Sequence, residues 1–387
     1  MPDLPSRREP FAAIYFFPCA AAYAALLLPW SVLAQLNLVQ KPVALSASMG
    51  HAHEMLFGFA LAVVAGYILG PQPRWLINSL LGVWLTARVA FLVAPESQAA
   101  ASLNLLFAGL LTWRVVPRFT RAAKKWRNKA VAPIIIGVGL TLGAYHLVPY
   151  LSWSWLRHSL LFEGVLLLSG LMFFMGGRMI APAIAGHLLK KGRDLEARVQ
   201  PGIEGSVLIL GALALTLQLV PFEEFRRITG SLLILIAGLT IVRTYRWQVW
   251  QALDRPDLLA LTLGYLWLAI GWILVGSSLL TGWIPLSSAL HAITIGALGT
   301  LTLTVMARTR LLRTRRDPNA APVIYLAVAL LSLAAVLRMA AATVLPIIPA
   351  QLGAAVCWSL AYGILLAVLV REGWKEREKA RRSSAAW

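Results

Sequence analysis

Residues 258–280 read LLALTLGYLWLAIGWILVGSSLL, a run of mostly apolar side chains with no charged residue among them. A helix of about 20 such residues spans the roughly 30 Å hydrocarbon core of a bilayer, because each residue adds about 1.5 Å. The run is continuous and does not alternate, which favours a helix over a strand of a membrane barrel. This stretch predicts a transmembrane helix.

The whole chain has the composition of a membrane protein. Of its 387 residues, 59% are apolar and 13% are charged, whereas a soluble domain carries about 25% charged residues. A net charge of +19 would suggest nucleic acid in a soluble protein, but basic loops also orient a membrane protein and attract anionic lipid. We expect membrane lipid and no nucleic acid as partner. Neither cysteine belongs to a CxxC motif, so no cysteine metal motif or disulfide framework is predicted.

The apolar runs predict an all-α integral membrane protein with about twelve transmembrane helices in one bundle. We place a cytoplasmic N-terminal segment at 1–10, the transmembrane domain at 11–371 and a basic cytoplasmic tail at 372–387. The predicted spans are 11–33, 50–70, 76–94, 98–116, 131–149, 158–182, 203–220, 228–247, 257–280, 285–306, 320–345 and 349–371.

The loops alternate sharply in positive charge. One set of loops and termini holds 27 lysines and arginines, and the other holds 4. Because cytoplasmic loops are enriched in these residues, the first set is predicted to be cytoplasmic. Both termini then lie inside, and the loop at 95–97 lies outside. The 4 exceptions are Lys41, Arg157, Arg226 and Arg227.

Five of the six histidines fall near outer ends of the predicted spans. They are His51, His53, His146, His158 and His291. Imidazoles near lipid usually have a partner, and a layer of them from different helices suits a haem or a copper ion. We predict that all but His158 bind metal. His158 is interpreted as an interfacial residue, and His187 as a solvated residue of a cytoplasmic loop.

The segment His51-Ala52-His53-Glu54 constrains such a site. On an ideal helix the two histidines are roughly 200° apart and cannot share one metal on one face. Either the helix begins between them, or they serve two sites. Glu54 lies on the face of His51 and could orient an imidazole or carry protons.

A few charged residues interrupt the apolar spans. They are Arg88, Glu163, Arg178 and Arg338. Charges in lipid are unfavourable, so these are expected to face the bundle interior. Arg88 and Arg178 are predicted to pair with haem propionates or with Glu163, with snorkelling as the alternative for Arg178. A row of small residues after His53 suits either close helix packing or a flat macrocycle. The row is Gly58, Ala62 and Gly66.

Two long segments resemble the signature of the NnrS family. They are HAHEMLFGFALAVVAGYILG at 51–70, and LGYLWLAIGWILVG followed by SALHAITIGALGTLTLTVMAR within 263–308. Shorter similarities are LTAR at 85–88, WRN at 126–128, AYH at 144–146 and GGRMIAP at 176–182.

The resemblance implies a bacterial inner-membrane protein of twelve helices, containing haem and copper and associated with resistance to nitric oxide and nitrosative stress. We expect the haem to be b-type and leave the copper open. The positions matching the family's polar residues are His51, His53, Glu54, His146 and His291.

The chain departs from that pattern in two places near the cytoplasmic side. Thr262 stands where family members often carry a histidine before the GYLW-like motif. The stretch LLRTRR at 311–316 stands where they often carry a GHTGR-like sequence. The outer histidine cluster is therefore the only metal site that we predict.

The expected protein acts on or responds to a small diatomic or nitrogen-oxide ligand, and the sequence names neither an electron donor nor a turnover reaction. One rival is a transporter for a metal or small molecule, whose histidines would hold the cargo transiently. A second rival is a non-catalytic partner or assembly factor of a respiratory complex.

Overall fold

The computed structural model describes residues 9–40, 42–120, 129–151, 153, 156–341 and 343–385. Within these ranges the chain is helical, and extended pairing is limited to one isolated bridge between Phe11 and Pro71. Twelve helical segments of this part are long and apolar enough to cross a membrane, which confirms the predicted fold class. The basic residues at 7, 8 and 121–127 and the WRN motif at 126–128 lie outside the described residues.

The first six spans begin close to where the predicted runs begin. They are α1 (Ala13–Gln35), α2 (Ser48–His53) continued by η2 (Glu54–Ala60) and α3 (Leu61–Ile68), α4 (Arg74–Val93), α5 (Gln98–Thr120), α7 (Val131–Leu147) with the turn η3 (Val148–Tyr150), and α8 (Leu156–Lys190). A short 3₁₀ turn, η1 (Val43–Ser46), precedes α2.

The last six spans complete the bundle. They are α9 (Pro201–Gln218) after the turn η4 (Glu196–Arg198), α10 (Glu223–Arg246), α11 (Pro256–Thr281) after the turn η5 (Val249–Ala252), α12 (Leu286–His291) continued by η6 (Ala292–Gly299) and α13 (Thr300–Arg315), α14 (Val323–Ala340) and α15 (Ile347–Ala385).

Three spans run further than predicted. Helix α13 continues to Arg315, past the predicted end of the tenth span at residue 306. Helix α8 has 35 residues, or roughly 52 Å at 1.5 Å per residue, and so exceeds the roughly 30 Å apolar core of a bilayer. Helix α15 continues to Ala385, so the predicted basic tail is largely a helical extension of the last span. Helix α11 shows how local sequence sets the ends: Pro256 occupies its first turn, and Gly282, at φ +67°, ends it in the left-handed conformation that glycine adopts without strain.

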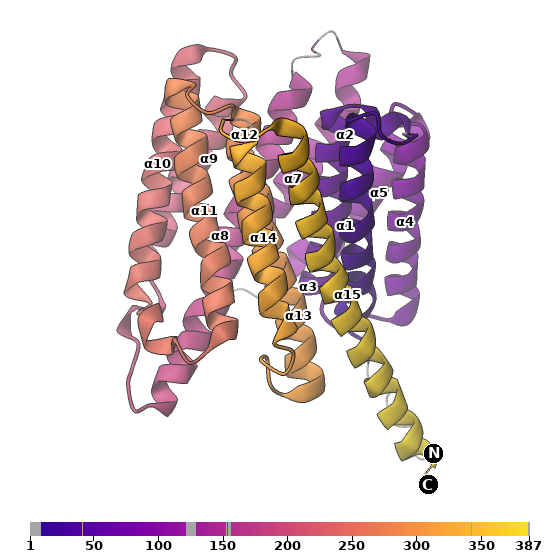
Figure 1. Cartoon of the computed structure of the whole chain (residues 1–387), viewed down its shortest axis with the longest axis vertical. Helices are drawn as coiled ribbons and strands as arrows, with labels where there is room; N and C mark the ends of the chain where they lie inside the picture. The colour runs from indigo at the N-terminus through magenta and orange to yellow at the C-terminus, as the bar shows by residue number, and fades with distance from the viewer. Residues whose placement is uncertain are drawn as a thin grey trace.

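Figure 1 shows the helices running side by side along one axis, with α1 beginning and α15 ending at the lower end of the bundle. We call the opposite end, which carries α2 and α12, the upper end; it is the end predicted to face outward. Three spans have the largest share of buried residues within an 18-residue apolar stretch. They are α8 (83%), α12–α13 (78%) and α2–α3 (72%). They form the centre of the bundle.

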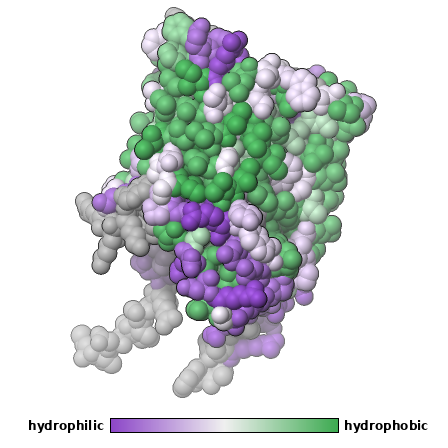
Figure 2. Space-filling view, turned by 90° about the vertical axis from the view of Figure 1, so that its left-hand side faces the viewer, coloured by the Kyte–Doolittle hydropathy of each residue, from purple (hydrophilic) through white to green (hydrophobic). Residues whose placement is uncertain are grey.

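The surface matches a lipid environment. Figure 2 shows a broad hydrophobic belt over one side of the bundle, with hydrophilic residues gathered toward the lower end and a smaller patch at the top. Large apolar side chains are exposed on several helices: Leu26 of α1, Leu140 of α7 and Ile209 of α9 are each about 70% exposed. A soluble monomer rarely exposes so large an apolar area, so the chain is a multi-pass membrane protein.

The second and tenth spans share an unusual construction. Each has a π-helical segment, η2 or η6, in its upper half. Each also carries a His-Ala pair just before or at the start of that segment, at His51-Ala52 and His291-Ala292. π segments within α-helices are rare, and those that occur are often at functional sites. Both spans therefore indicate a functional site at the upper end.

Candidate functional site

A cavity of about 330 Å³ opens among α1, α2, α8, α12, α14 and α15. We call it the upper cavity. Its wall is mainly apolar, with Leu56, Phe162, Ile295 and Trp358 among the lining side chains. Its ionisable lining residues are His51, His158, His291 and Arg338. A largely apolar pocket with a few convergent polar groups is the usual form of a small-molecule or cofactor site.

Hydrogen bonds fix the proton on His291. Its Nδ1 lies 2.5 Å from the carbonyl oxygen of Ser287, one turn earlier. A carbonyl only accepts, so Nδ1 carries the proton and donates it. No described residue bonds Nε2, which therefore keeps a free lone pair at the cavity that His291 lines.

The same protonation state follows for His51. Its Nδ1 lies 2.8 Å from the hydroxyl oxygen of Ser31, and that hydroxyl donates its own proton to the carbonyl of Leu28 at 2.8 Å. The hydroxyl must then accept from Nδ1, which leaves Nε2 of His51 unprotonated. Metal-ligating histidines commonly donate the other ring N–H in this way, because that bond orients the ring.

Arg338 supplies the positive charge of the upper cavity. No carboxylate lines this cavity, and no described carboxylate pairs with the guanidinium. A cation with this environment favours a ligand that brings negative charge. His158, near the start of α8, also lines the cavity, although the residue is exposed.

His53 and His146 form a separate pair beside this cavity. Their Nε2 atoms lie 3.3 Å apart, and their side chains are almost fully buried. Phe91 stacks on His53 with ring centroids 3.7 Å apart, and Tyr145 packs at 5.1 Å. The Nε2 separation suits either one N–H···N hydrogen bond or two nitrogens that face a common ion.

A buried ion pair holds His53 in place. The Nδ1 of His53 lies 2.9 Å from Oε1 of Glu54, and Arg88 Nη1 lies 2.5 Å from the same oxygen. Tyr23 donates to the other carboxylate oxygen, and Arg88 also donates to Asn104. The carboxylate accepts from Nδ1–H, so His53 too presents an unprotonated Nε2, now toward His146.

These contacts decide the alternatives left by the sequence. The helix begins at Ser48, before both histidines, so His51 and His53 occupy two different environments. Glu54 bonds His53 and not His51, whose Nδ1 is bonded to Ser31 instead. Arg88 pairs with Glu54 and not with Glu163, the other partner considered for it.

Arg178 and the row of small residues also have packing contacts. Arg178 lies over the ring of Phe119, with its guanidinium carbon 5.5 Å from the ring centroid, and does not line the upper cavity. A Cβ added at Gly58 would lie 2.8 Å from Arg88, and one added at Gly66 would lie 2.6 Å from Phe17. Gly58 and Gly66 therefore allow close helix packing, one of the two interpretations of the row.

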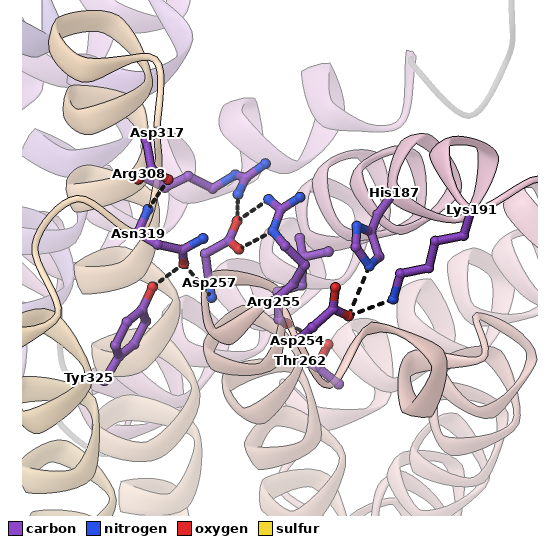
Figure 3. Close-up of polar contacts among 11 residues, drawn as sticks. His187, Lys191, Asp254, Arg255, Asp257, Thr262, Arg308, Asp317, Asn319 and Tyr325 are labelled. Atoms are coloured by element: carbon purple, nitrogen blue, oxygen red, sulfur yellow. Dashed lines mark hydrogen bonds and ion pairs between the residues drawn. The ribbon is translucent and has the colours of Figure 1, made fainter.

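The lower end carries a polar network in place of a histidine cluster (Figure 3). Asp257 accepts from Arg255 at 2.9 and 3.0 Å and pairs with Arg308. Asn319 accepts from the Asp257 backbone at 3.2 Å. Thr262, at the position of the missing family histidine, donates to a carbonyl of its own helix at 2.8 Å. This end is held by ion pairs.

His187 also differs from its prediction. It lies in the last turns of α8, is 9% exposed, and its Nε2 lies 3.0 Å from Asp254. It is therefore not a solvated loop residue, because α8 runs past the predicted end of the sixth span. Lys191 reaches the same Asp254 oxygen at 2.8 Å; Figure 3 shows both contacts.

The positions of the histidines suit a haem better than a metal ion held by three or more side chains. In the part of the chain that the structure describes, no three histidine, cysteine, aspartate or glutamate side chains converge as ligands of one metal ion. A haem needs only one or two axial side chains, and the upper cavity offers two imidazoles with free Nε2 atoms. Sequence reasoning missed Arg338 and His158 as cavity residues; their placement at outer ends of spans was the only available signal.

A family model described as NnrS protein matches residues 9–377, nearly the whole chain. None of the curated proteins searched matches it.

Proposed function

The chain belongs to the NnrS family, and from this premise we propose that it is a haem-binding membrane protein of nitric oxide response or nitrosative-stress resistance. The observation that carries the proposal is the pair of imidazoles from α2 and α12, His51 and His291, that line one apolar cavity with unprotonated Nε2 atoms. Neutral imidazole is the usual axial ligand of haem iron in many haem proteins.

The cavity has the donor set that a haem requires. Apolar side chains such as Leu56, Ile295 and Leu298 suit the faces of a macrocycle, and His51 or His291, or both, would hold the iron. Arg338 would neutralise a propionate, since no protein carboxylate in the cavity competes for it. Arg338 thus takes the role that the sequence gave to Arg88 and Arg178.

When bound, haem supplies an iron that binds small diatomic molecules and exchanges electrons. The chain's own contribution is positional. Ser31 and the Ser287 carbonyl fix the ring orientation of the two imidazoles, and the apolar wall restricts water around them. The fixed ring orientation would hold the imidazoles ready for the iron. The apolar wall favours a small uncharged ligand over a hydrated ion.

Copper has a weaker fit. His53 and His146 supply two imidazoles, and no third ligand side chain converges on them among the described residues. We assign copper, if the protein binds it, to this pair and not to the upper cavity. A bacterial inner-membrane location is part of the same proposal, and the family and the twelve spans support it.

The visible spectrum of the detergent-purified protein, oxidised and dithionite-reduced, tests the proposal. We expect a Soret band and reduced α and β bands of a b-type haem, and a spectral shift on adding nitric oxide. A preparation that is colourless but binds a metal ion reversibly would support the transporter. A preparation without cofactor that co-purifies with a respiratory complex would support the assembly factor.

A further inference from the structure

The two imidazoles that line the upper cavity, His51 and His291, donate to acceptors of different kinds. Nδ1 of His291 donates to the Ser287 carbonyl, 2.5 Å away and one turn earlier in the same helix. Nδ1 of His51 donates to the Ser31 hydroxyl, 2.8 Å away on α1. The Ser31 side chain is buried, which shields this hydrogen bond from solvent. A carbonyl can only accept a hydrogen bond, whereas a hydroxyl can also donate one.

The carbonyl acceptor fixes the proton on His291. If Nδ1 lost its proton, a ring lone pair would face the carbonyl oxygen across 2.5 Å, and neither atom could donate. Two facing acceptors without a proton between them are unfavourable. The neutral ring of His291 therefore presents an unprotonated Nε2 and has no second arrangement.

The proton on His51 is not fixed in the same way. The Ser31 hydroxyl donates to the Leu28 carbonyl at 2.8 Å, but rotation about its Cβ–Oγ bond turns the hydroxyl proton toward Nδ1 of His51. Nδ1 then loses its own proton to water and Nε2 gains one from water, so the ring stays neutral. Leu28 lies inside α1, where its carbonyl also accepts from the backbone four residues later. The reversal therefore leaves no buried acceptor unpaired.

The two rings are thus suited to different roles toward a haem iron. His51 can present either a lone pair or an N–H at Nε2, and His291 presents only a lone pair. Haem iron has two axial positions, and if both rings held it permanently, no position would remain for the diatomic ligand of the proposed function. The ring suited to yield its position is the one that can exchange its lone pair for an N–H.

We propose that His291 is the permanent axial ligand and that His51 is the exchangeable one, which leaves the iron to a diatomic molecule and then donates its Nε2–H to that molecule. Ser31 is the positioning residue for this change, because its hydroxyl accepts from Nδ1 in one arrangement and donates to it in the other. A hydrogen-bond donor in an apolar cavity stabilises partial negative charge on such a ligand. The assignment rests on the proposed function.

Replacing each histidine by glycine tests the assignment, because free imidazole can enter the space that a deleted ring leaves. His291→Gly, purified without imidazole, should lose the haem bands, and imidazole added during purification should restore them. His51→Gly should retain haem without imidazole and show the spectrum of an iron that has lost one axial ligand. Equal haem contents in the two variants, the reverse pattern, or bands that imidazole does not restore in His291→Gly would each overturn the inference.

Ser31→Ala tests the positioning role. It should keep the haem and release nitric oxide about fivefold faster than wild type, the effect of one weakened hydrogen bond. Deuterated buffer should shift the N–O stretching frequency of nitric oxide bound to the wild type, because the donor proton exchanges, and this shift should be smaller in Ser31→Ala. A wild-type frequency that does not respond to deuteration would contradict a hydrogen bond from His51.

Ser169→Ala is the matched control for Ser31→Ala. The Ser169 hydroxyl is also buried and donates to a carbonyl three residues earlier, at 2.7 Å, but it does not line the upper cavity. It should release nitric oxide at the wild-type rate. Equal rates in the two serine variants would contradict the role of Ser31.

Failure of the proposed function would look different. Wild-type protein without haem bands would overturn the proposed function before any variant is compared, whereas wild-type haem with the wrong histidine pattern would overturn only the assignment. If His291→Gly does not insert into the membrane, Ser31→Ala and the wild-type response to deuterated buffer carry the test.

Discussion

His53 and His146 lie with their Nε2 atoms 3.3 Å apart, although 93 positions of sequence separate them. His51, only two residues from His53, instead lines the upper cavity with His291. The four histidines of one predicted cluster therefore form two pairs. Haem is proposed for the cavity pair, and the buried pair is the place to look for copper.

Copper binding should depend on the buried pair alone. His53→Ala and His146→Ala each remove one of two facing imidazoles, so either should abolish any copper measured by elemental analysis. Tyr145→Phe serves as the control. Tyr145 packs beside the pair, and the change leaves both imidazoles in place. Copper retained at the wild-type level in both histidine variants would show that the pair is only a hydrogen bond.

Glu54→Gln should lower stability strongly. The change leaves the Arg88 guanidinium, 3% exposed, without its carboxylate, and breaking one half of a buried ion pair typically costs about 3–5 kcal/mol. We expect a clear fall in the thermal unfolding temperature in detergent. If His53 holds a metal, its spectrum or potential should also shift, because Glu54 orients that ring.

The control for this prediction is Glu96→Gln. Glu96 pairs with Arg157 at 2.8 Å, but its carboxylate is 55% exposed, and exposed pairs contribute about 0–1 kcal/mol. Equal losses in the two variants would mean that burial of the Glu54–Arg88 pair has no special effect.

The orientation in the membrane is a prediction from charge. The 27-to-4 asymmetry of the loops places both termini in the cytoplasm and residues 95–97 outside. A fluorescent reporter fused after Trp387 should fold in the cytoplasm, and a cysteine introduced at Ser97 should react with an impermeant thiol reagent from outside. A C-terminal reporter that is active only in the periplasm would show that the bundle has the opposite orientation.

Asp254 gives a pH-dependent prediction outside the spans. The Lys191 ammonium, followed in effect by His187, lowers the pKa of the Asp254 carboxyl from 3.8 to about 2. A lowered pKa means that the contact stabilises the folded state above about pH 4 and that this stabilisation is lost as the pH falls through about 2. Lys191→Met should therefore raise the pKa of Asp254, measured by NMR of labelled aspartate.

The neighbouring lysine provides the comparison. Lys190 makes no contact with Asp254, so Lys190→Met should leave the carboxyl pKa unchanged. An Asp254 pKa that responds equally to both substitutions would reflect general surface charge and not the Lys191 contact.

The fold was predictable because span length and loop charge are properties of the sequence alone. Twelve apolar runs predicted twelve spans, and their order placed five histidines toward the upper end. The partners were not predictable in the same way. Ideal helical geometry assigned Glu54 to the face of His51, but its carboxylate bonds the adjacent His53. Which arginine reaches the cavity depends on helix packing, and Arg338 does so while Arg88 does not.

The reduced-minus-oxidised visible spectrum of purified His51→Ala and His291→Ala, compared with wild type, tests the central claim most directly. Both residues line the upper cavity with a free Nε2, so each substitution should abolish the haem bands or shift them by loss of an axial ligand. His187→Gln, at the lower end, keeps a donor toward Asp254 and should retain the wild-type spectrum. Wild-type haem bands in both cavity variants would contradict the account.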